Sequence, residues 1–504
     1  TGLPDGWQDS LAWPVSLDSR RARTLGLIGR ALDWLRDIGD ADARRAAILA
    51  SADFLTVTGR ILDRAHVLAS AHDAGQAIAG DDAETDYLWR GGDPPEATLR
   101  HPTMPGGALR RLRGLRHARR WTPTWRLPAT ALAPHATVLS LNDLLVDCAR
   151  RASLRLDYTD PRLLLPAAAV TAVPDDTDRD LATRWVDDAF AVSNLPEPFA
   201  TRARTLVESH TRRGIAAART LLEALRHQRL PPHLWAGTGG NMTTRALGLE
   251  AMRRGGTVAR FNHGGSVGLT DYGDKLAFLE FTTSTRYVAP TAAIADIVRT
   301  DAAQRDWPEP IAIDHGRGDP LFARIAACTP RTRPARPTVA YVTCLFPVNQ
   351  IHFPPAPPDP VYFAWQLRLI AALRRLPIDL VCRPHPENLM LFDRQPLEGH
   401  ATLSDAAFGA VVESSDVMLF DWAQTTSFWE TLCSDRPVVL VDVNRTAFHP
   451  TVRATIARRC RIVPTCSDDR NLPIVDPDAL AAAICDAPAR ADPGEIRSLL
   501  AGDL

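Results

Sequence analysis

Three things are scarce in this chain of 504 residues: lysine, net charge and long apolar runs. Lys275 is the single lysine, so the remaining cations among the 58 Lys and Arg residues are arginines. The formal net charge of -1 excludes the global basic field of a dedicated nucleic-acid-binding protein. The richest apolar run, LLLPAAAVTAVP, is broken by proline and falls short of the roughly 18 residues of a membrane-spanning helix. A transmembrane protein is therefore not expected.

Paired cysteines and a leader segment are also missing. The eight cysteines form no CxxC pair, which favours free thiols in a reduced, cytosolic chain. Cys460 and Cys466 lack neighbouring histidines at ligand spacing, so no metal site is expected there. No basic-then-apolar segment follows Thr1, and we expect a processed or trimmed cytoplasmic chain rather than an exported one.

The first 130 residues are expected to form a helical region that ends in a basic connection. From Arg20 to Ala79 apolar residues recur every three or four positions, the period of an amphipathic helix. Residues 110–126 then carry seven arginines with Trp121 and Trp125. Such a segment can contact an acidic membrane surface as a peripheral anchor, or an anionic glycan; an ordinary solvated face is the alternative.

The residues after the first 130 are expected to form an α/β structure. HLWAGTGGNMTTRALGLEAMRRGGTVARFNHGG, from residue 233, has the order strand, glycine turn, helix, strand, which is a βαβ unit. A segment rich in proline and arginine at 327–338 separates it from a second series of short strands and helices. We therefore predict Rossmann-like domains over 131–330 and 331–504. Ligands are expected in a cleft between their carboxyl edges.

Candidate catalytic residues gather after the second strand of the βαβ unit. The strand ending FNHGG delivers His263 to the edge of the sheet, and Asp271, Lys275 and Glu280 follow within one short segment. A histidine, carboxylates and an ammonium can supply a general base, its orienting partner and an anion contact. A surface loop rich in acids is the competing interpretation.

The second domain offers candidates for phosphate binding. The motif RPHPEN at a strand end presents Arg383, His385 and Glu387. His385 can donate to a phosphate oxygen and Arg383 can bind it in bidentate fashion. Further along, ESSDVMLFDWAQTTSFWE is expected to place two serines after a strand and hydroxyls at a helix start, with simple helix capping as the alternative. The residues concerned are Ser414, Ser415, Thr425, Thr426, Ser427 and Glu430.

These motifs carry a family resemblance. RPHPEN and the hydroxyl pairs resemble the HP and serine/threonine motifs with which bacterial sialyltransferases and capsule-type Kdo transferases hold the CMP of their donor. The resemblance covers roughly residues 234–442. It implies the GT-B fold, two Rossmann-like domains facing across a cleft, and a cytoplasmic, metal-independent glycosyltransferase of polysaccharide biosynthesis. His385 would contact the donor phosphate, the serines and threonines phosphate or ribose, and Glu387 or Glu430 ribose or cytosine.

One departure from the family pattern shifts the expected catalytic residue. Retaining Kdo transferases of the capsule type carry an aspartate in the loop after the first strand of the second domain. Here that loop holds Asn349, Gln350 and His352 instead. The carboxylates of the first domain therefore take the catalytic role, with Asp271 as the first choice for general base and Glu280 as the second. This favours direct displacement with inversion.

The leading hypothesis is transfer of a CMP-activated ulosonate, such as Kdo or a sialic-acid-like sugar, to a bacterial surface polysaccharide, lipopolysaccharide or glycoprotein. Three alternatives remain: a CDP-glycerol-type polyol-phosphate transferase, a UDP-sugar 2-epimerase and a non-catalytic glycan-binding module. The 2-epimerase pattern of serine-glycine-glycine followed by paired glutamates is not found in the chain. Expected partners are the nucleotide sugar and a glycan or glycolipid acceptor, without nucleic acid.

Overall fold

The computed structural model describes most of the chain and places two parallel sheets and a helical region within it. The residues described are 7–76, 82–96, 135–165, 172–191, 193–304, 307–325, 327–329, 334–346, 356–390, 392–443 and 447–502. Across these ranges every helix is too short or too polar to cross a membrane. All eight cysteines within them are free thiols.

The first sheet has six parallel strands in the order β2-β1-β3-β4-β5-β6. The βαβ unit expected from the glycine pattern is confirmed as β3, α9 and β4, with Asn241 capping the helix through its side chain. The strand bounds are β1 His135–Ser140, β2 Arg155–Tyr158, β3 His233–Ala236, β4 Thr257–Phe261, β5 Arg286–Ala289 and β6 Ala312–His315.

The second sheet also has six strands, in the order β12-β11-β10-β9-β7-β8. Its pairs are parallel except for β12, which runs antiparallel to β11. The order reverses between β7 and β9, because β8 lies on one side of β7 and later strands on the other. The bounds are β7 Thr338–Val342, β8 Asp379–Arg383, β9 Val417–Phe420, β10 Val438–Asp442, β11 Cys460–Ser467 and β12 Pro473–Val475.

Helices cover both sheets and build the additional region. Those of the first half are α1 Trp7–Ser10, α2 Leu17–Arg36, α3 Ala41–Asp73, α4 Ala83–Arg90, α6 Asp143–Arg151, η2 Pro161–Leu164, α7 Asp176–Phe190, α8 Phe199–Arg226, α9 Met242–Arg253, α10 Gly273–Leu279 and η3 Phe281–Thr283. Those of the second half are α11 Ala292–Ala303, α12 Pro320–Ala323, α13 Asp359–Leu373, η4 Pro386–Met390, α14 Phe408–Ser414, α15 Thr426–Leu432, α16 Pro450–Arg459, α17 Pro477–Cys485 and α18 Gly494–Leu500.

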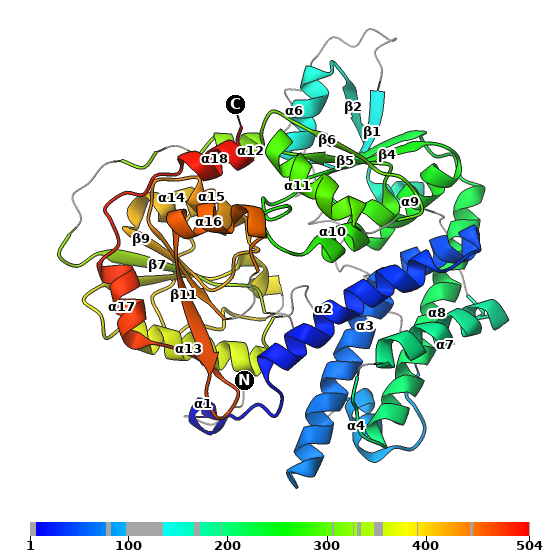
Figure 1. Ribbon diagram of the computed structural model, residues 1–504, viewed down its shortest axis with the longest axis horizontal. Coiled ribbons are helices and arrows are strands. Elements are labelled where there is room, and N and C mark those ends of the chain that lie inside the picture. The colour runs from blue at the N-terminus through cyan, green and yellow to red at the C-terminus, as the bar shows by residue number, and fades with distance from the viewer. Residues whose placement is uncertain are drawn as a thin grey trace.

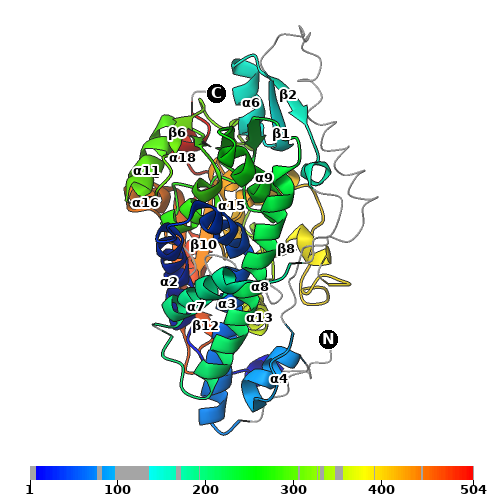
Figure 2. The same cartoon turned by 90° about the vertical axis from the view of Figure 1, so that its right-hand side faces the viewer.

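The helical region is confirmed and includes more of the chain than its N-terminal part. Helices α3, α4, α7 and α8 gather on one side of the first sheet (Figures 1 and 2). Trp34, Phe54 and Trp185 join α2, α3 and α7 through ring contacts of 5.3 to 5.7 Å between centroids. All three rings are at most 2% exposed, so their apolar surface drives this packing.

The two sheet domains contact each other along their facing edges. Backbone hydrogen bonds join Asp271 to Ala447 at 2.7 Å and His449 to Leu269 at 3.0 Å around an antiparallel bridge. At the far end of the chain, α18 packs against α11 and α12 of the first domain. One apolar core runs without a break from the helical region through the first sheet to one face of the second. The arrangement is that of two Rossmann-like domains facing each other, the GT-B architecture.

Candidate functional site

A pocket lies where the strand order of the second sheet reverses. It has a cavity volume of about 230 Å³ and is built from the loops that follow β7, β8 and β9. Ligands of open α/β sheets bind at this kind of reversal point, outside the carboxyl ends of the strands. We call it the switch-point pocket. Its lining residues are Cys344, Leu345, His385, Glu387, Trp422, Gln424, Thr425 and Thr426.

His385 lines this pocket, and a hydrogen bond from the local backbone sets its tautomer. Its Nδ1 accepts a hydrogen bond from the amide of Glu387 at 3.3 Å, so the neutral ring carries its proton on Nε2. Partial burial lowers the pKa of His385, while nearby Glu387 acts to raise it and Arg383 to lower it further. The half-buried imidazole can therefore donate one hydrogen bond to a ligand oxygen.

A buried polar network supports the floor of the switch-point pocket. The carboxylate of Asp421 accepts hydrogen bonds from Tyr341 at 2.5 Å, Tyr362 at 3.2 Å and Trp365 at 3.3 Å. The hydroxyl of Tyr362 in turn accepts the amide of Cys344 at 2.8 Å. Asp421 is fully buried, and a buried carboxylate with several donors fixes the strand ends that carry it. The network thus holds the loops after β7 and β9 in fixed positions.

Thr425 and Thr426 stand where α15 begins, as the sequence indicates. Thr425 is the N-cap residue, but its side chain makes no capping hydrogen bond. A Cβ atom on Gly264 of the first domain would lie 2.9 Å from the hydroxyl of Thr426. The glycine therefore lets the loop after β4 approach the switch-point pocket closely.

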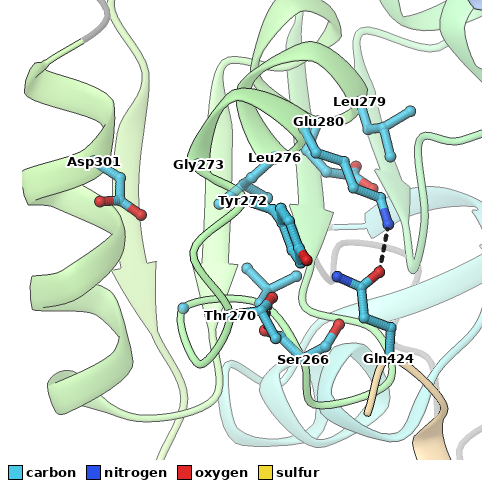
Figure 3. A pocket seen from close by; sticks show the side chains of 12 residues that line it. Ser266, Thr270, Tyr272, Gly273, Leu276, Leu279, Glu280, Asp301 and Gln424 are labelled. Atoms are coloured by element: carbon cyan, nitrogen blue, oxygen red, sulfur yellow. Dashed lines mark hydrogen bonds between the residues drawn. The ribbon is translucent and has the colours of Figure 1, made fainter. Parts of the chain in front are cut away.

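A second pocket lies between the domains, next to the first. Figure 3 shows Asp301 on one side, Glu280 on the other and Gln424 entering from the second domain. The ammonium of Lys275 donates to Oε1 of Gln424 at 3.1 Å, which links α10 to the loop after β9. We call this the interdomain pocket. Its lining residues are Ser266, Val267, Gly268, Thr270, Tyr272, Gly273, Lys275, Leu276, Leu279, Glu280, Asp301 and Gln424.

Glu280 is the carboxylate best placed for chemistry in the interdomain pocket. Its Oε2 accepts the amide of Gly239 at 3.0 Å, so the glycine turn after β3 positions it. Burial raises the pKa of Glu280, while Arg260, the Gly239 amide and Arg245 oppose the rise. A carboxyl group with a raised pKa is better suited to accept a proton than an exposed one.

Asp271 and His263, two other predicted catalytic residues, occupy different positions. Asp271 is exposed, its backbone amide is bonded to Ala447, and its side chain does not line the interdomain pocket. His263 follows β4 at the facing edge and remains accessible to solvent, although surrounding protein lowers its pKa by desolvation. The geometry therefore favours Glu280 over Asp271 as general base, the reverse of the order expected from the sequence.

The two serines expected after a strand precede it instead. Ser414 ends α14, and Ser415 follows before β9, so both lie at the amino edge of the sheet, away from the switch-point pocket. Their hydroxyls donate to the carbonyl of Val411 at 3.2 and 2.7 Å. Val411 and Val412, the apolar residues before the serines, are buried on the helix α14, so the strand comes after the serines. The placement expected for these serines is wrong.

Three further candidates lie outside both pockets. Arg383 ends β8, with Nη1 3.4 Å from the carbonyl of Ser404. Ser427 lies within α15, where its carbonyl accepts a hydrogen bond from Thr431 at 2.8 Å. Glu430 lines a separate hollow beside Cys328. The segment 110–126 and the residues Asn349, Gln350 and His352 fall outside the described residues.

Sequence reasoning missed Gln424, Trp422 and Asp301. Gln424 and Trp422 sit in DWAQTT, between the strand and the helix already noted, so their position after a strand was the available signal. Asp301 lies on α11 and pairs with His449 of the second domain at 3.6 Å, a contact that only the tertiary structure brings about. Among the described residues, no group of three His, Cys, Asp or Glu side chains could hold a metal ion.

Among known proteins, solved structures resemble this chain at low sequence identity. No protein-family model and no curated protein matches the chain. The complex of MnaA from S. aureus with UDP is 10% identical, covering 70% of this chain and 87% of that one with a TM-score of 0.35. A putative UDP-N-acetylglucosamine 2-epimerase from Listeria monocytogenes is 11% identical, covering 72% and 93%, with a TM-score of 0.34.

Proposed function

We propose that this protein is an enzyme that binds a nucleotide sugar, with the nucleotide phosphate in the switch-point pocket. The observation that carries the proposal is the position of His385, which offers an Nε2–H donor beside the hydroxyls of Thr425 and Thr426 at the reversal point of the sheet. Hydrogen bonds from these groups would stabilise the charge that develops on a departing phosphate.

The reaction we propose is glycosyl transfer. The oxygen of an acceptor hydroxyl attacks the anomeric carbon, the bond from that carbon to the phosphate oxygen breaks, and the phosphate leaves with the electron pair. Glu280 accepts the hydroxyl proton, as its position in the interdomain pocket allows. A CMP-linked acidic sugar is the donor we favour, since Lys275 offers an ammonium for a sugar carboxylate.

A 2-epimerase acting on a UDP-sugar is the second candidate. It would use the same two pockets, because its substrate also combines a nucleotide phosphate with a sugar. The two activities differ in one respect that can be measured. An epimerase converts its nucleotide sugar without an acceptor, whereas a transferase releases nucleotide in proportion to the acceptor consumed.

A donor screen tests the proposal directly. The full chain is incubated with CMP-, CDP-, UDP- and GDP-sugars, with and without an oligosaccharide acceptor, and nucleotide release and donor isomers are followed by chromatography and mass spectrometry. We expect turnover of one nucleotide class. Glycan binding without binding or turnover of any donor would identify a non-catalytic module and refute the proposal.

His385→Ala is predicted to weaken nucleotide binding. Loss of a hydrogen bond to a charged phosphate costs about 1.5 to 3 kcal/mol, or roughly a 10- to 150-fold higher Kd. Calorimetric titration with the nucleotide that the screen selects measures this change. His400→Ala provides the matched control, since His400 is exposed on the same domain and lies outside the pocket. Equal affinity for both variants would contradict the proposed role.

A further inference from the structure

Two buried arginines approach Glu280 from the interior of the first domain. Arg260 on β4 and Arg245 on α9 are both completely buried, and neither lines the interdomain pocket. A buried guanidinium needs hydrogen-bond acceptors or an opposite charge nearby, because it keeps its own charge. The proposed glycosyl transfer assigns no role to either residue.

Arg245 is satisfied mainly by backbone carbonyl groups. Its Nη1 donates to the carbonyls of Phe278 and Leu279 at 3.0 and 3.2 Å. Its Nη2 donates to the carbonyl of Ile48, on α3, at 3.0 Å. Since Phe278 and Leu279 end α10 directly before Glu280, Arg245 fixes the backbone that carries the carboxylate.

Arg260 has fewer hydrogen bonds and faces the carboxylate itself. Its Nη2 donates to the carbonyl of Thr244 at 3.0 Å, but its Nε and Nη1 have no hydrogen-bond partner within the described ranges. Nε of Arg260 and Oε2 of Glu280 lie so close to Gly239 that a Cβ atom there would crowd both. Burial lowers the pKa of Arg260, and Glu280 is the charged group that opposes this effect.

Other ionisable groups surround Glu280 on several sides. They are Arg260 from β4, Arg245 from α9, Tyr287 from β5, Lys275 from α10 and Asp301 from α11, with Asp53 of α3 acting on Arg245. Tyr287 stays neutral, because burial raises its pKa well above the usual value. Burial also raises the pKa of Glu280, and Arg260 opposes this rise more strongly than the Gly239 amide or Arg245 does.

We propose that Arg260 is a positioning residue for Glu280: its buried guanidinium keeps the carboxylate charged at the wall of the interdomain pocket without touching a substrate. A carboxyl group enclosed by protein and lacking this cation would retain its proton and could not accept one from a hydroxyl group. The role in turnover rests on the proposed function, whereas the coupling between the two charges rests on their burial.

Infrared difference spectroscopy tests the charge of Glu280 without an enzymatic assay. Subtracting the spectrum of Glu280→Gln at pH 7 isolates this carboxyl group. We expect an ionised carboxylate in the full-length wild type, and in Arg260→Met a protonated-carboxyl band that is lost in Arg260→Met/Glu280→Gln. Arg286→Met is the matched control, since this exposed arginine on the adjacent strand pairs with Asp314. It should leave Glu280 ionised.

Two spectroscopic results would overturn the proposal: a protonated Glu280 in the wild type, or an ionised one in Arg260→Met. Urea unfolding provides a second measurement. Glu280→Gln should lower the folding equilibrium constant about tenfold less in Arg260→Met than in the wild type, because the charges are coupled. If Arg260→Met alone does not fold, folding should return in the double variant, in which neither charge is buried. A double variant that also fails to fold would overturn the coupling.

The pH profile of turnover separates a positioning role from a merely structural one. With the donor that the screen selects, the acidic limb for Arg260→Met should lie about 1 to 3 pH units higher, the usual effect of removing an adjacent opposite charge from a carboxylate. Arg260→Lys should return the limb close to its wild-type position. An unchanged limb in active Arg260→Met would refute the positioning role. Absence of turnover by the wild type, with the expected infrared result, would overturn the proposed function only.

Discussion

Gly239 illustrates how closely the residues of the interdomain pocket fit. A Cβ atom at this position would lie 2.7 Å from Oε2 of Glu280 and 3.0 Å from Nε of Arg260. Arg260 is fully buried on β4, where Nη2 donates to the carbonyl of Thr244 at 3.0 Å. The backbone, the carboxylate and the guanidinium thus share a space that admits no side chain.

Gly239→Ala is therefore predicted to displace Glu280 from the Gly239 amide. We expect loss of turnover of the donor that the screen selects, together with destabilisation of about 1 to 3 kcal/mol from overpacking. The neighbouring Gly240→Ala serves as the control, because its Cβ would meet only the hydroxyl of Thr238, at 3.5 Å. Nucleotide release from that donor and urea unfolding distinguish the two variants. Similar behaviour of both variants would show that the close contact at Gly239 has no consequence.

At the scale of single elements, helix α3 links the helical region together. It packs along α8 and α2, and Asp40 caps its start by accepting the amide of Ala43 at 2.7 Å. His66 lies on this helix near Arg23 of α2. Burial lowers the pKa of His66 to about 4, Arg23 lowers it further and Asp63 acts in the opposite direction.

This histidine predicts a pH dependence of stability. An unfolded histidine has a pKa of about 6.5, so protons bind the unfolded chain more tightly than the folded one between about pH 6.5 and pH 4. The contribution of His66 to stability is complete above pH 6.5 and declines as the pH falls. His66→Gln should lose less stability between pH 7 and pH 5 than the wild type, as measured by urea unfolding.

The matched control is His227→Gln, at the exposed end of α8. We expect its change in stability between the two pH values to equal that of the wild type. If His66→Gln behaves in the same way as this control, burial of His66 has no effect on the pH dependence.

At the scale of the whole molecule, the N-terminal segment contacts both sheet domains. The ring of Trp7 stacks on Phe363 of α13 at 5.9 Å, and the carbonyl of Trp13 accepts a hydrogen bond from Asn471 at 2.8 Å. Helix α2 then crosses to α10 of the first domain, the helix that carries Lys275 (Figure 1). The segment from α1 to α2 is thus a strap across the two domains.

Arg20 anchors this strap, and we expect its substitution to lower the free energy of unfolding. Its Nε donates to Asp63 at 2.7 Å, and Nη1 donates to the carbonyl of Ala356 in the second domain. Arg20→Met leaves Asp63 largely buried without this partner, so we expect a loss of about 3 kcal/mol in unfolding free energy. X-ray scattering of the variant should show a larger radius of gyration.

Arg36→Met on the same helix is the comparison. Arg36 pairs with Asp33 and Asp37 near the surface, and exposed pairs contribute roughly 0 to 1 kcal/mol. If the two variants unfold at the same urea concentration, Arg20 does not hold the strap in place.

Local patterns in the chain predicted most of the elements and their order. Periodicity and glycine turns predicted the βαβ unit, the alternation of strands and helices, the strand end before His385 and the helix start at Thr425, because these signals are local. The placement of Ser414 was wrong because the apolar residues before it, Val411 and Val412, lie on a helical turn, and the strand follows only at Val417–Phe420. Two features follow from tertiary packing and not from local patterns: Glu280 rather than Asp271 lines the interdomain pocket, and Lys275 donates to Gln424. Whether α10 faces the second domain depends on packing between segments that are far apart in the sequence. A local sequence pattern carries no information about such packing.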